Sequence, residues 1–469
     1  MNSRLEYFKE EIKDKKVAVL GIGVSNIPAI EYLVRLGAKV TARDIKKELG
    51  PECDKLKELD IEFVLGDEYL DGLSEYDYIL RSPGVKPFEK GIEEAAENGV
   101  ILTSEIELLM QLCNCKIIGV TGSDGKTTTT TLIAKFLEQA GFKVWIGGNI
   151  GVPLFSKLDE IKESDIVVLE LSSFQLMTMK ISPNIAIITN ISPNHLNYHR
   201  DYEEYIEAKK NIFLNQKPGD IVILNKDSEF TDKFINEDCI LGDIREFSIV
   251  NVPEIGVYLK DGNIVSNISG KEEIVVGVDE VLLVGMHNIA NICAASTAVI
   301  DITGVEPIRD VVITFKGVEH RMEFVDTING VKWYNDSIGS SPTRTIAGLV
   351  AFKQKIILIA GGYDKNIPYD EIGKYIIDKV KVLLLIGKTA PKIEAAVVNE
   401  AKKQSINIDE YVKIVNLNTM DECIEYANSI AIEGDIVVLS PASASFDMYK
   451  DFEDRGNHFK KLVGELKNK

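Results

Sequence analysis

The sequence of 469 residues contains few cysteines, few histidines and no long hydrophobic run. Only Cys113 and Cys115 of the six cysteines lie close together, which argues against a disulfide framework and a structural zinc site, so we expect reduced thiols. No apolar run reaches the ~18 residues that a membrane helix needs, and residues 1–16 lack the apolar core of a signal peptide. We therefore expect a cytoplasmic protein with no membrane partner.

Positive charge is also in short supply. The chain has 53 Lys and Arg against 73 Asp and Glu, a net charge of −20. An acidic surface repels the phosphates of nucleic acids, so we expect no nucleic-acid partner. A locally basic pocket can still bind a small anionic substrate.

Short apolar runs alternate with helical segments along the whole chain. This pattern predicts an α/β protein with parallel sheets covered on both faces. One helix is expected over residues 27–36, where Gly37 ends it. Buried strands are expected at residues 17–20, 39–42, 78–80, 116–120, 166–169, 185–189, 221–224, 356–360, 382–386 and 436–439.

The length suggests about three domains. The strands group into an N-terminal Rossmann-like domain at residues 1–104, a central ATPase-type domain at 105–317 and a C-terminal Rossmann-like domain at 318–469. Residues 256–278 break the pattern, because their side chains alternate and Asp261-Gly262 is a hairpin turn signal. We expect a small antiparallel addition there.

The strongest motif follows the strand at residues 116–120 and opens a helix that runs to about Ala140. It reads Gly119-Val-Thr-Gly-Ser-Asp-Gly-Lys-Thr-Thr128. Backbone N–H groups of such a loop bind phosphate, Lys126 would reach the β/γ-phosphates, and the Thr127 hydroxyl would ligate Mg²⁺. The strict P-loop spacing places glycine at position 120, which is valine here.

Two later strands end in polar side chains. Glu170 follows one strand, and His195 and His199 follow the next. Parallel strands direct their carboxyl ends toward one ligand crevice, so Glu170 is predicted to bind Mg²⁺ beside the phosphate loop. His195 is predicted to bind a metal or a substrate phosphate.

The N-terminal strand is followed by Gly21-Ile22-Gly23-Val24-Ser25-Asn26, and Asp44 ends the second strand. The third glycine of the dinucleotide fingerprint is Asn26, so the motif fits any nucleotide whose diphosphate lies at the helix N-terminus. Arg81-Ser82-Pro83-Gly84 is expected to flank the same crevice.

Taken together, the motifs resemble the Mur ligase family over essentially the whole chain. The matching segments in chain order are Ser82-Pro83-Gly84, the phosphate loop, Gly148-Asn149-Ile150-Gly151, Glu170 to Leu176, Asn194-His195-Leu196, Glu207-Ala208-Lys209, His287-Asn288 with Asn291, Glu319-His320-Arg321, Asn335-Asp336-Ser337 and Ser440 to Ser445.

The resemblance implies an ATP-dependent ligase of peptidoglycan precursor synthesis that adds D-glutamate to UDP-N-acetylmuramoyl-L-alanine. ATP would phosphorylate the substrate carboxylate, and the amine of D-glutamate would attack the acyl phosphate. The implied cofactors are two Mg²⁺ ions, one of them bound by Lys209 after carbamylation by CO₂ together with His195. We expect a monomer.

The resemblance also assigns residues to each ligand. The nucleotide-sugar would contact Gly23, Ser25, Asp44, Ser82, Gly84 and Asn149. The ATP and metal centre would contain Gly122, Ser123, Asp124, Gly125, Lys126, Thr127, Thr128, Glu170, His195 and Lys209, with Asn288, Asn291, Arg321 and Asp336 binding other parts of ATP. Lys365, Ser445 and Phe452 would hold D-glutamate.

Some positions depart from the family pattern. A lysine often follows Asn-Asp-Ser in the family, whereas Ile338 stands here, and Asn197 and Tyr198 replace an acidic and a basic residue. Four alternatives remain: a Mur ligase for another amino acid, a folylpolyglutamate synthase, an NAD-dependent dehydrogenase suggested by Gly21 and Gly23, and a catalytically inactive nucleotide-binding regulator.

Overall fold

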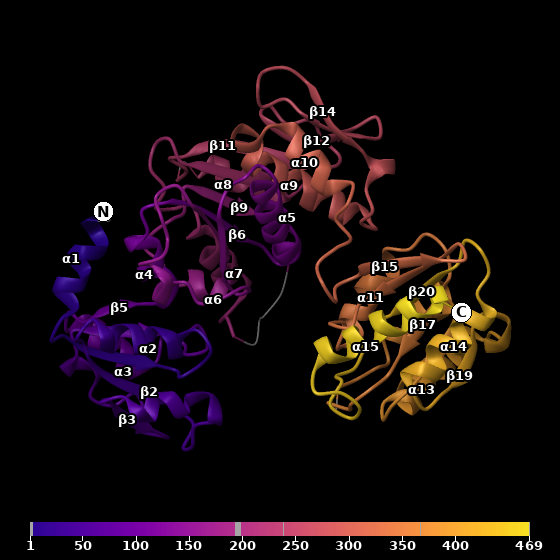
Figure 1. Cartoon of the computed structure of the whole chain (residues 1–469), viewed down its shortest axis with the longest axis horizontal. Coiled ribbons are helices and arrows are strands. Elements are labelled where there is room, and N and C mark those ends of the chain that lie inside the picture. Colours follow the sequence, from indigo (N-terminus) through magenta and orange to yellow (C-terminus); the bar gives the residue numbers. More distant parts are fainter. Residues whose placement is uncertain (1–2, 193–197, 238, 366, 469) are drawn as a thin grey trace. The chain divides into compact units, whose positions relative to one another are not determined.

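The computed structural model describes residues 3–192, 198–237, 239–365 and 367–468. Three sheets carry the fold, and two compact units contain them. The first unit comprises residues 1–278 and 289–311, and the second comprises residues 279–288 and 312–469. The predicted α/β class is confirmed, and Figure 1 shows helices covering the sheets within each unit.

The first sheet has the strand order β3-β2-β1-β4-β5, with every pair parallel, which is the predicted Rossmann-like arrangement. Its strands are β1 (Lys16–Leu20), β2 (Lys39–Asp44), β3 (Glu62–Leu65), β4 (Tyr78–Arg81) and β5 (Ile101–Thr103). The helices around it are α1 (Ser3–Ile12), α2 (Asn26–Arg35) and α3 (Lys90–Glu97). Gly37 follows α2 with a φ of 88°, as the predicted helix end requires.

The second sheet has nine strands in the order β14-β13-β12-β11-β10-β9-β6-β8-β7. They are β6 (Lys116–Thr121), β7 (Val144–Gly148), β8 (Ile166–Glu170), β9 (Ile185–Ile188), β10 (Ile221–Asn225), β11 (Asp243–Ser248), β12 (Gly256–Lys260), β13 (Asn263–Ser266) and β14 (Glu273–Gly277). Its helices are α4 (Glu105–Leu112), α5 (Lys126–Gln139), α6 (Ser173–Leu176), α7 (Tyr202–Lys210), α8 (Glu229–Asn236), α9 (Met286–Thr303) and α10 (Val305–Val312).

The predicted antiparallel addition is confirmed as β12, β13 and β14. Asp261 and Gly262 join β12 to β13 with φ values of 49° and 75°. Positive φ at both central residues is the geometry that lets a two-residue turn follow the strand twist.

One hydrophobic core joins the first two sheets. It runs from Phe8 and Tyr32 through Phe155 to the side chains of β8 and β9. The Phe155 ring contacts Phe8 at 6.3 Å and Tyr32 at 5.2 Å between centroids. The first two predicted domains therefore share buried apolar surface, and the boundary at residue 104 stays a prediction.

The third sheet has the order β15-β16-β20-β17-β18-β19 and is parallel except for β15. Its strands are β15 (Glu323–Ile328), β16 (Val331–Asn335), β17 (Ile356–Ala360), β18 (Val380–Leu385), β19 (Lys413–Asn416) and β20 (Ile436–Leu439). The helices are α11 (Pro342–Val350), α12 (Ile372–Lys379), α13 (Ala390–Gln404), α14 (Met420–Ile430) and α15 (Phe452–Glu465).

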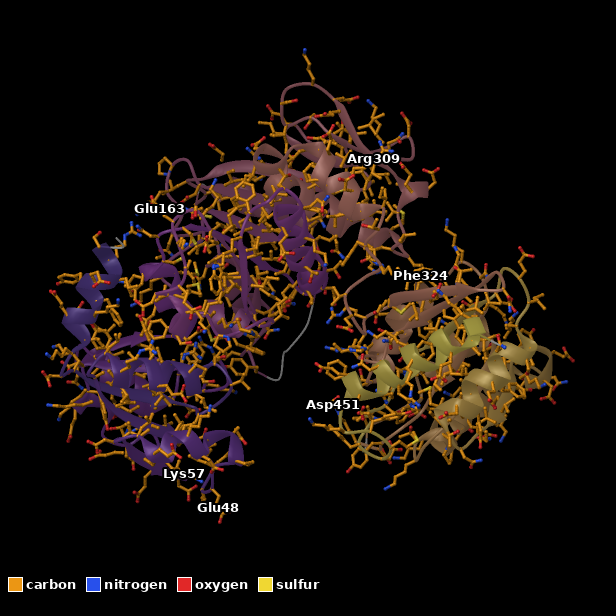
Figure 2. The ribbon with its side chains drawn as sticks, viewed as in Figure 1. Glu48, Lys57, Glu163, Arg309, Phe324 and Asp451 are labelled. Carbon is orange, nitrogen blue, oxygen red and sulfur yellow. The ribbon has the colours of Figure 1, made fainter. Side chains whose placement is uncertain are left out.

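Separate hydrophobic clusters around Leu358 and Ile359 pack against this third sheet. Two residues labelled in Figure 2 illustrate local packing: Phe324 of β15 contacts Tyr334 edge to face, and the Asp451 carboxylate accepts a hydrogen bond from Asp454 N to begin α15. Among the described residues, no helix is both long enough and apolar enough to cross a bilayer.

Candidate active site

The phosphate loop leaves β6 and enters α5 through two glycines with positive φ, Gly122 at 148° and Gly125 at 81°. A Cβ atom on Gly122 would lie 1.9 Å from Thr189 Oγ1, and one on Gly125 would lie 2.3 Å from Asn291 Oδ1. These close approaches exclude side chains at both positions, so glycine is required for the loop to pack against Thr189 and Asn291 where it enters α5.

Neighbouring segments hold the loop in place. Ser123 Oγ donates to Ser192 O at 2.9 Å and shares a hydrogen bond of 2.8 Å with Tyr205 OH. Asp124 N donates to Asn190 Oδ1 at 2.9 Å, and Thr189 Oγ1 donates to Asp124 O at 2.6 Å. The loop is therefore preorganised by residues that follow β9.

Two lysines converge on this loop. Lys126 Nζ donates to Gly122 O at 2.8 Å and to Ser123 O at 2.9 Å. Lys209 Nζ, from α7, donates to Gly122 O at 2.8 Å and is only 1% exposed. Burial lowers the pKa of Lys209 well below its usual value, the charge of Lys126 lowers it further, and Asp124 opposes the shift.

Lys210, the next residue of α7, points away from the phosphate loop. Its Nζ forms ion pairs with Glu207, at 3.0 Å, and with Glu237, and these carboxylates hold the Lys210 pKa above its usual value despite burial. Adjacent lysines of one helix therefore have opposite electrostatic surroundings.

Glu170 ends β8 beside the loop and is 2% exposed. Its Oε1 accepts a hydrogen bond from Asn149 Nδ2 at 2.9 Å, and within the described residues its buried Oε2 has no hydrogen-bond partner. A buried, unpaired carboxylate oxygen fits a hard cation such as Mg²⁺.

Thr127 and His195 are also predicted magnesium ligands. Thr127 lies in the first turn of α5, and His195 lies outside the described residues. In the described part of the chain, no three His, Cys, Asp or Glu side chains gather into a metal cluster. Mg²⁺ at a phosphate loop commonly uses one or two carboxylates together with substrate oxygens, so Glu170 fits that pattern.

Five of the six predicted nucleotide-sugar residues, all except Asn149, lie at or after the carboxyl ends of β1, β2 and β4 in the first sheet. The Asp44 carboxylate accepts hydrogen bonds from Ile22 N at 2.8 Å and Lys46 N at 2.9 Å. A Cβ on Gly21 would lie 2.7 Å from Ser82 Cβ, which places the two loops in contact, whereas Cβ atoms on Gly23 and Gly84 would meet open space. Ser25 is half-buried at the start of α2.

Asn26, which replaces the third fingerprint glycine, has a structural function. Its Nδ2 donates to Gly21 O at 2.8 Å and to Leu20 O at 3.3 Å, so the side chain ties α2 to the end of β1. Asn149 lies farther from the predicted sugar residues along the chain and contacts Glu170 instead.

In the second unit, the Asp336 carboxylate is buried and accepts hydrogen bonds from Ser440 Oγ at 2.6 Å and Met322 N at 3.2 Å. Burial raises the Asp336 pKa to about 6. Arg321 lies between two residues with positive φ, His320 at 62° and Met322 at 43°, backbone conformations that cost free energy and persist only where surrounding contacts hold them.

Two of the residues predicted to hold D-glutamate, Lys365 and Ser445, lie in loops of this unit, and Phe452 is the first residue of α15. Ser445 is buried, Phe452 is half-buried with its ring 6.0 Å from that of His320, and Lys365 is exposed. Asn288 Nδ2 donates to Val284 O at 2.8 Å within the same unit, while Asn291 Oδ1 accepts a hydrogen bond of 3.4 Å from Thr129 Oγ1 of α5 in the first unit.

Sequence reasoning missed Arg455, which is fully buried in α15. Its guanidinium donates to Ser337 Oγ at 3.0 Å, Ser337 O at 2.8 Å, Ser443 O at 3.1 Å and Ala444 O at 3.0 Å. One cation therefore fixes two motif loops that are about a hundred residues apart in sequence. A single arginine on an amphipathic helix gives no signal of this in the sequence.

His199, which follows the same strand as His195, is buried. Its Nε2 shares a hydrogen bond of 2.9 Å with Ser173 Oγ, and its ring stacks 5.6 Å from that of Phe174. These contacts make His199 part of the packing around α6.

A phosphate loop, a buried carboxylate and two converging lysines on a parallel sheet define an α/β protein that binds a nucleotide phosphate. Sequence profiles agree: a Mur ligase middle domain matches residues 120–299, a Mur ligase glutamate ligase domain matches 320–443, and a MurD-like N-terminal domain matches 15–104. The chain belongs to the Mur ligase family.

Relatives from two bacteria are similar over their full length. The UDP-N-acetylmuramoylalanine--D-glutamate ligase of Acetivibrio thermocellus is 51% identical, covering 99% of this chain and 100% of the relative. The protein of the same name from Ruminiclostridium cellulolyticum is 50% identical, covering all of both chains. The crystal structure of UDP-N-acetylmuramate-alanine ligase from Thermotoga maritima shares the fold, with a TM-score of 0.55, 18% identity and coverage of 96% and 99%.

Proposed function

We propose that this chain is a cytoplasmic ATP-dependent ligase that adds D-glutamate to UDP-N-acetylmuramoyl-L-alanine during peptidoglycan precursor synthesis. The observation that carries the chemistry is the convergence of Lys126 and Lys209 on the Gly122 carbonyl beside Glu170. The substrate identity is supported by full-length relatives at about half identity that carry that name.

A carboxylate resists attack by an amine, so it must first gain a leaving group. The terminal phosphoryl group of ATP is transferred to an oxygen of the L-alanine carboxylate, and ADP leaves. The amine of D-glutamate then attacks the acyl carbon, the C–N bond forms as the C–O bond to phosphate breaks, and the amine loses a proton. Catalysis of both steps depends mainly on positioning and charge neutralisation.

The phosphate loop binds the phosphates through its N–H groups, and Lys126 supplies a cation to the transferred phosphoryl group. Glu170 and Thr127, with His195, would hold magnesium, which supplies further charge neutralisation at the phosphates. Asn149 keeps the Glu170 carboxylate oriented through its hydrogen bond to Oε1.

Lys209 is suited to carbamylation. Its lowered pKa leaves more neutral amine, which attacks CO₂ to form an N–C bond with release of a proton. The product is an anion whose oxygens could bind a second magnesium ion, where an ammonium would repel it. By family resemblance, Lys365, Ser445 and Phe452 are proposed for D-glutamate, and Arg321 and Asp336 are proposed for ATP.

The test is phosphate release with ATP, UDP-N-acetylmuramoyl-L-alanine and a panel of D- and L-amino acids. D-glutamate alone should give turnover that requires all three substrates. Turnover with another amino acid would indicate a different Mur ligase. Turnover with folates and glutamate would indicate a folylpolyglutamate synthase. A chain that binds ATP but shows no turnover would indicate a regulator. NAD binding by calorimetry would instead support a dehydrogenase.

A further inference from the structure

Arg81 ends β4 directly before the Ser82-Pro83-Gly84 loop, and its side chain is 1% exposed. Its Nη1 donates to Val85 O at 2.6 Å and to Ser82 O at 3.3 Å. Its Nη2 donates to two residues outside the first sheet, Phe174 O at 3.1 Å and Thr178 Oγ1 at 3.2 Å. One guanidinium therefore clamps the loop to the segment that follows Glu170.

Tyr198 reinforces the same junction. Its hydroxyl donates to Pro83 O at 2.8 Å, and its ring packs 4.1 Å from the ring of Phe174. The Ser82–Val85 loop is thus held from both sides by groups that also contact α6.

The contacts continue to the phosphate loop. Ser173, beside Phe174, bonds to His199, whose ring meets that of Tyr205 at 5.3 Å, and Tyr205 OH bonds to Ser123 Oγ. A continuous series of packed and hydrogen-bonded side chains therefore joins the Ser82–Val85 loop, called here the nucleotide-sugar loop, to the phosphate loop.

We infer that Arg81 is a positioning residue that aligns the nucleotide-sugar loop with Glu170 and the phosphate loop. The inference rests on the proposed function and adds a residue that does not itself touch substrate. Arginine suits this position because its planar fork reaches four acceptors at once, whereas lysine offers one compact ammonium.

The experiment compares Arg81→Lys with Arg43→Lys. Arg43 is a matched control, because it is also a buried arginine of the first sheet and donates to two carbonyls, Tyr69 O at 3.0 Å and Asp71 O at 2.7 Å. Both carbonyls belong to the segment between β3 and β4, so Arg43→Lys tests for a general loss of packing. Steady-state kinetics would be measured for all three substrates, with ATP affinity and unfolding midpoints alongside.

Arg81→Lys should lower kcat/KM for the nucleotide-sugar by about 10- to 100-fold, since displacement of a reacting group by about 1 Å can cost on that order. ATP affinity should stay within about twofold, because the hydrogen bonds of Arg81 go to Ser82, Val85, Phe174 and Thr178 and the phosphate loop lies farther along the series of contacts. Arg43→Lys should leave both constants near wild type. Equal effects of the two substitutions would overturn the inference.

Thr178→Val and Tyr198→Phe remove single contacts and serve if Arg81→Lys does not fold. Each should lower kcat/KM for the nucleotide-sugar by a smaller factor than Arg81→Lys does. The loss of kcat/KM in the double variant Arg81→Lys with Thr178→Val should be smaller than the two single losses combined. Full additivity, or no effect of either single variant, would contradict the clamp. A wild-type chain without ligase turnover would instead refute the proposed function, and the inference with it.

Discussion

Lys126 Nζ and Lys209 Nζ each donate a hydrogen bond of 2.8 Å to the same carbonyl oxygen, that of Gly122. Two amines that share one acceptor repel each other when both are charged, and Lys209 is the one with a pKa lowered by burial. The site therefore contains a cation suited to phosphate and an amine that is more easily neutral. Tyr205 packs against the amine, with Lys209 Nζ 4.6 Å from the ring centroid.

Lys126→Ala should abolish ligation while the fold survives. Loss of one cation that stabilises the transferred phosphoryl group should cost on the order of 10²-fold or more in rate. Lys135→Ala is the control, because Lys135 is exposed on the same helix. Phosphate release and circular dichroism would be compared, and a Lys126→Ala enzyme with near wild-type turnover would refute the ATP site.

Lys209→Ala should lose most activity, whereas Lys210→Ala should not. The reason is that Lys209 contacts the phosphate loop and Lys210 pairs with Glu207 and Glu237. A small added carboxylic acid should partly restore Lys209→Ala by replacing the carbamate. Turnover would be measured in CO₂-free and CO₂-equilibrated buffer, and full activity of Lys209→Ala without CO₂ would exclude the carbamate.

Lys365→Ala should mainly raise the Michaelis constant for D-glutamate, and Ser445→Ala should act in the same direction. Binding of a dicarboxylate requires a cation and hydrogen-bond donors in the site. Such a site discriminates strongly against amino acids that lack the second carboxylate. Lys402→Ala is the control, since Lys402 is exposed in the same unit on α13. An effect confined to the nucleotide-sugar constant would contradict the assignment.

Glu105 should make stability fall as pH rises. Burial raises its pKa to about 7, although the backbone N–H of Phe155 donates to its Oε1 at 2.9 Å and opposes the shift. The folded state holds this proton more tightly than the unfolded chain does. The contribution of Glu105 to the free energy of unfolding is therefore complete below about pH 4.5 and is lost as pH rises through about 7.

Glu105→Gln keeps an oxygen acceptor for Phe155 N and removes the charge, so it should flatten this dependence. Between about pH 5 and about pH 8.5 the free energy of unfolding of the wild type should fall by on the order of 3 kcal/mol, a loss that the variant should not show. Urea unfolding midpoints at both pH values test this, with exposed Glu97→Gln as the control. Parallel pH profiles for wild type and Glu105→Gln would contradict the prediction.

Much of the fold was predictable because its signals are local. The strands at residues 356–360 and 436–439 have the predicted bounds, and the Asp261-Gly262 turn joins the predicted hairpin. The helix after the phosphate loop ends at Gln139, one residue before the expected Ala140. Apolar runs and glycines specify such features through their own backbone preferences.

The site was predictable in part, because family motifs mark residues but not their partners. Asn149 was expected near the sugar, and its amide contacts Glu170. Arg81 was expected beside the crevice, and its four hydrogen bonds, to Ser82 and Val85 and to Phe174 and Thr178 after β8, could not be read from the strand that carries it. The assigned ligand contacts remain predictions, and His195 lies outside the described residues.

The sequence by itself determined the order of strands and helices, the glycine turns and the phosphate loop, since each depends on a few consecutive residues. Only the tertiary structure decided which of Lys209 and Lys210 bonds to the phosphate loop and which pairs with glutamates, and which of Arg43 and Arg81 reaches α6. Burial and hydrogen-bond partners are set by segments that are distant in sequence: Gly122 lies 87 residues from Lys209, and Phe174 lies 93 residues from Arg81. The physical reason is that pKa and orientation depend on the surrounding atoms, which the chain supplies only once it has folded.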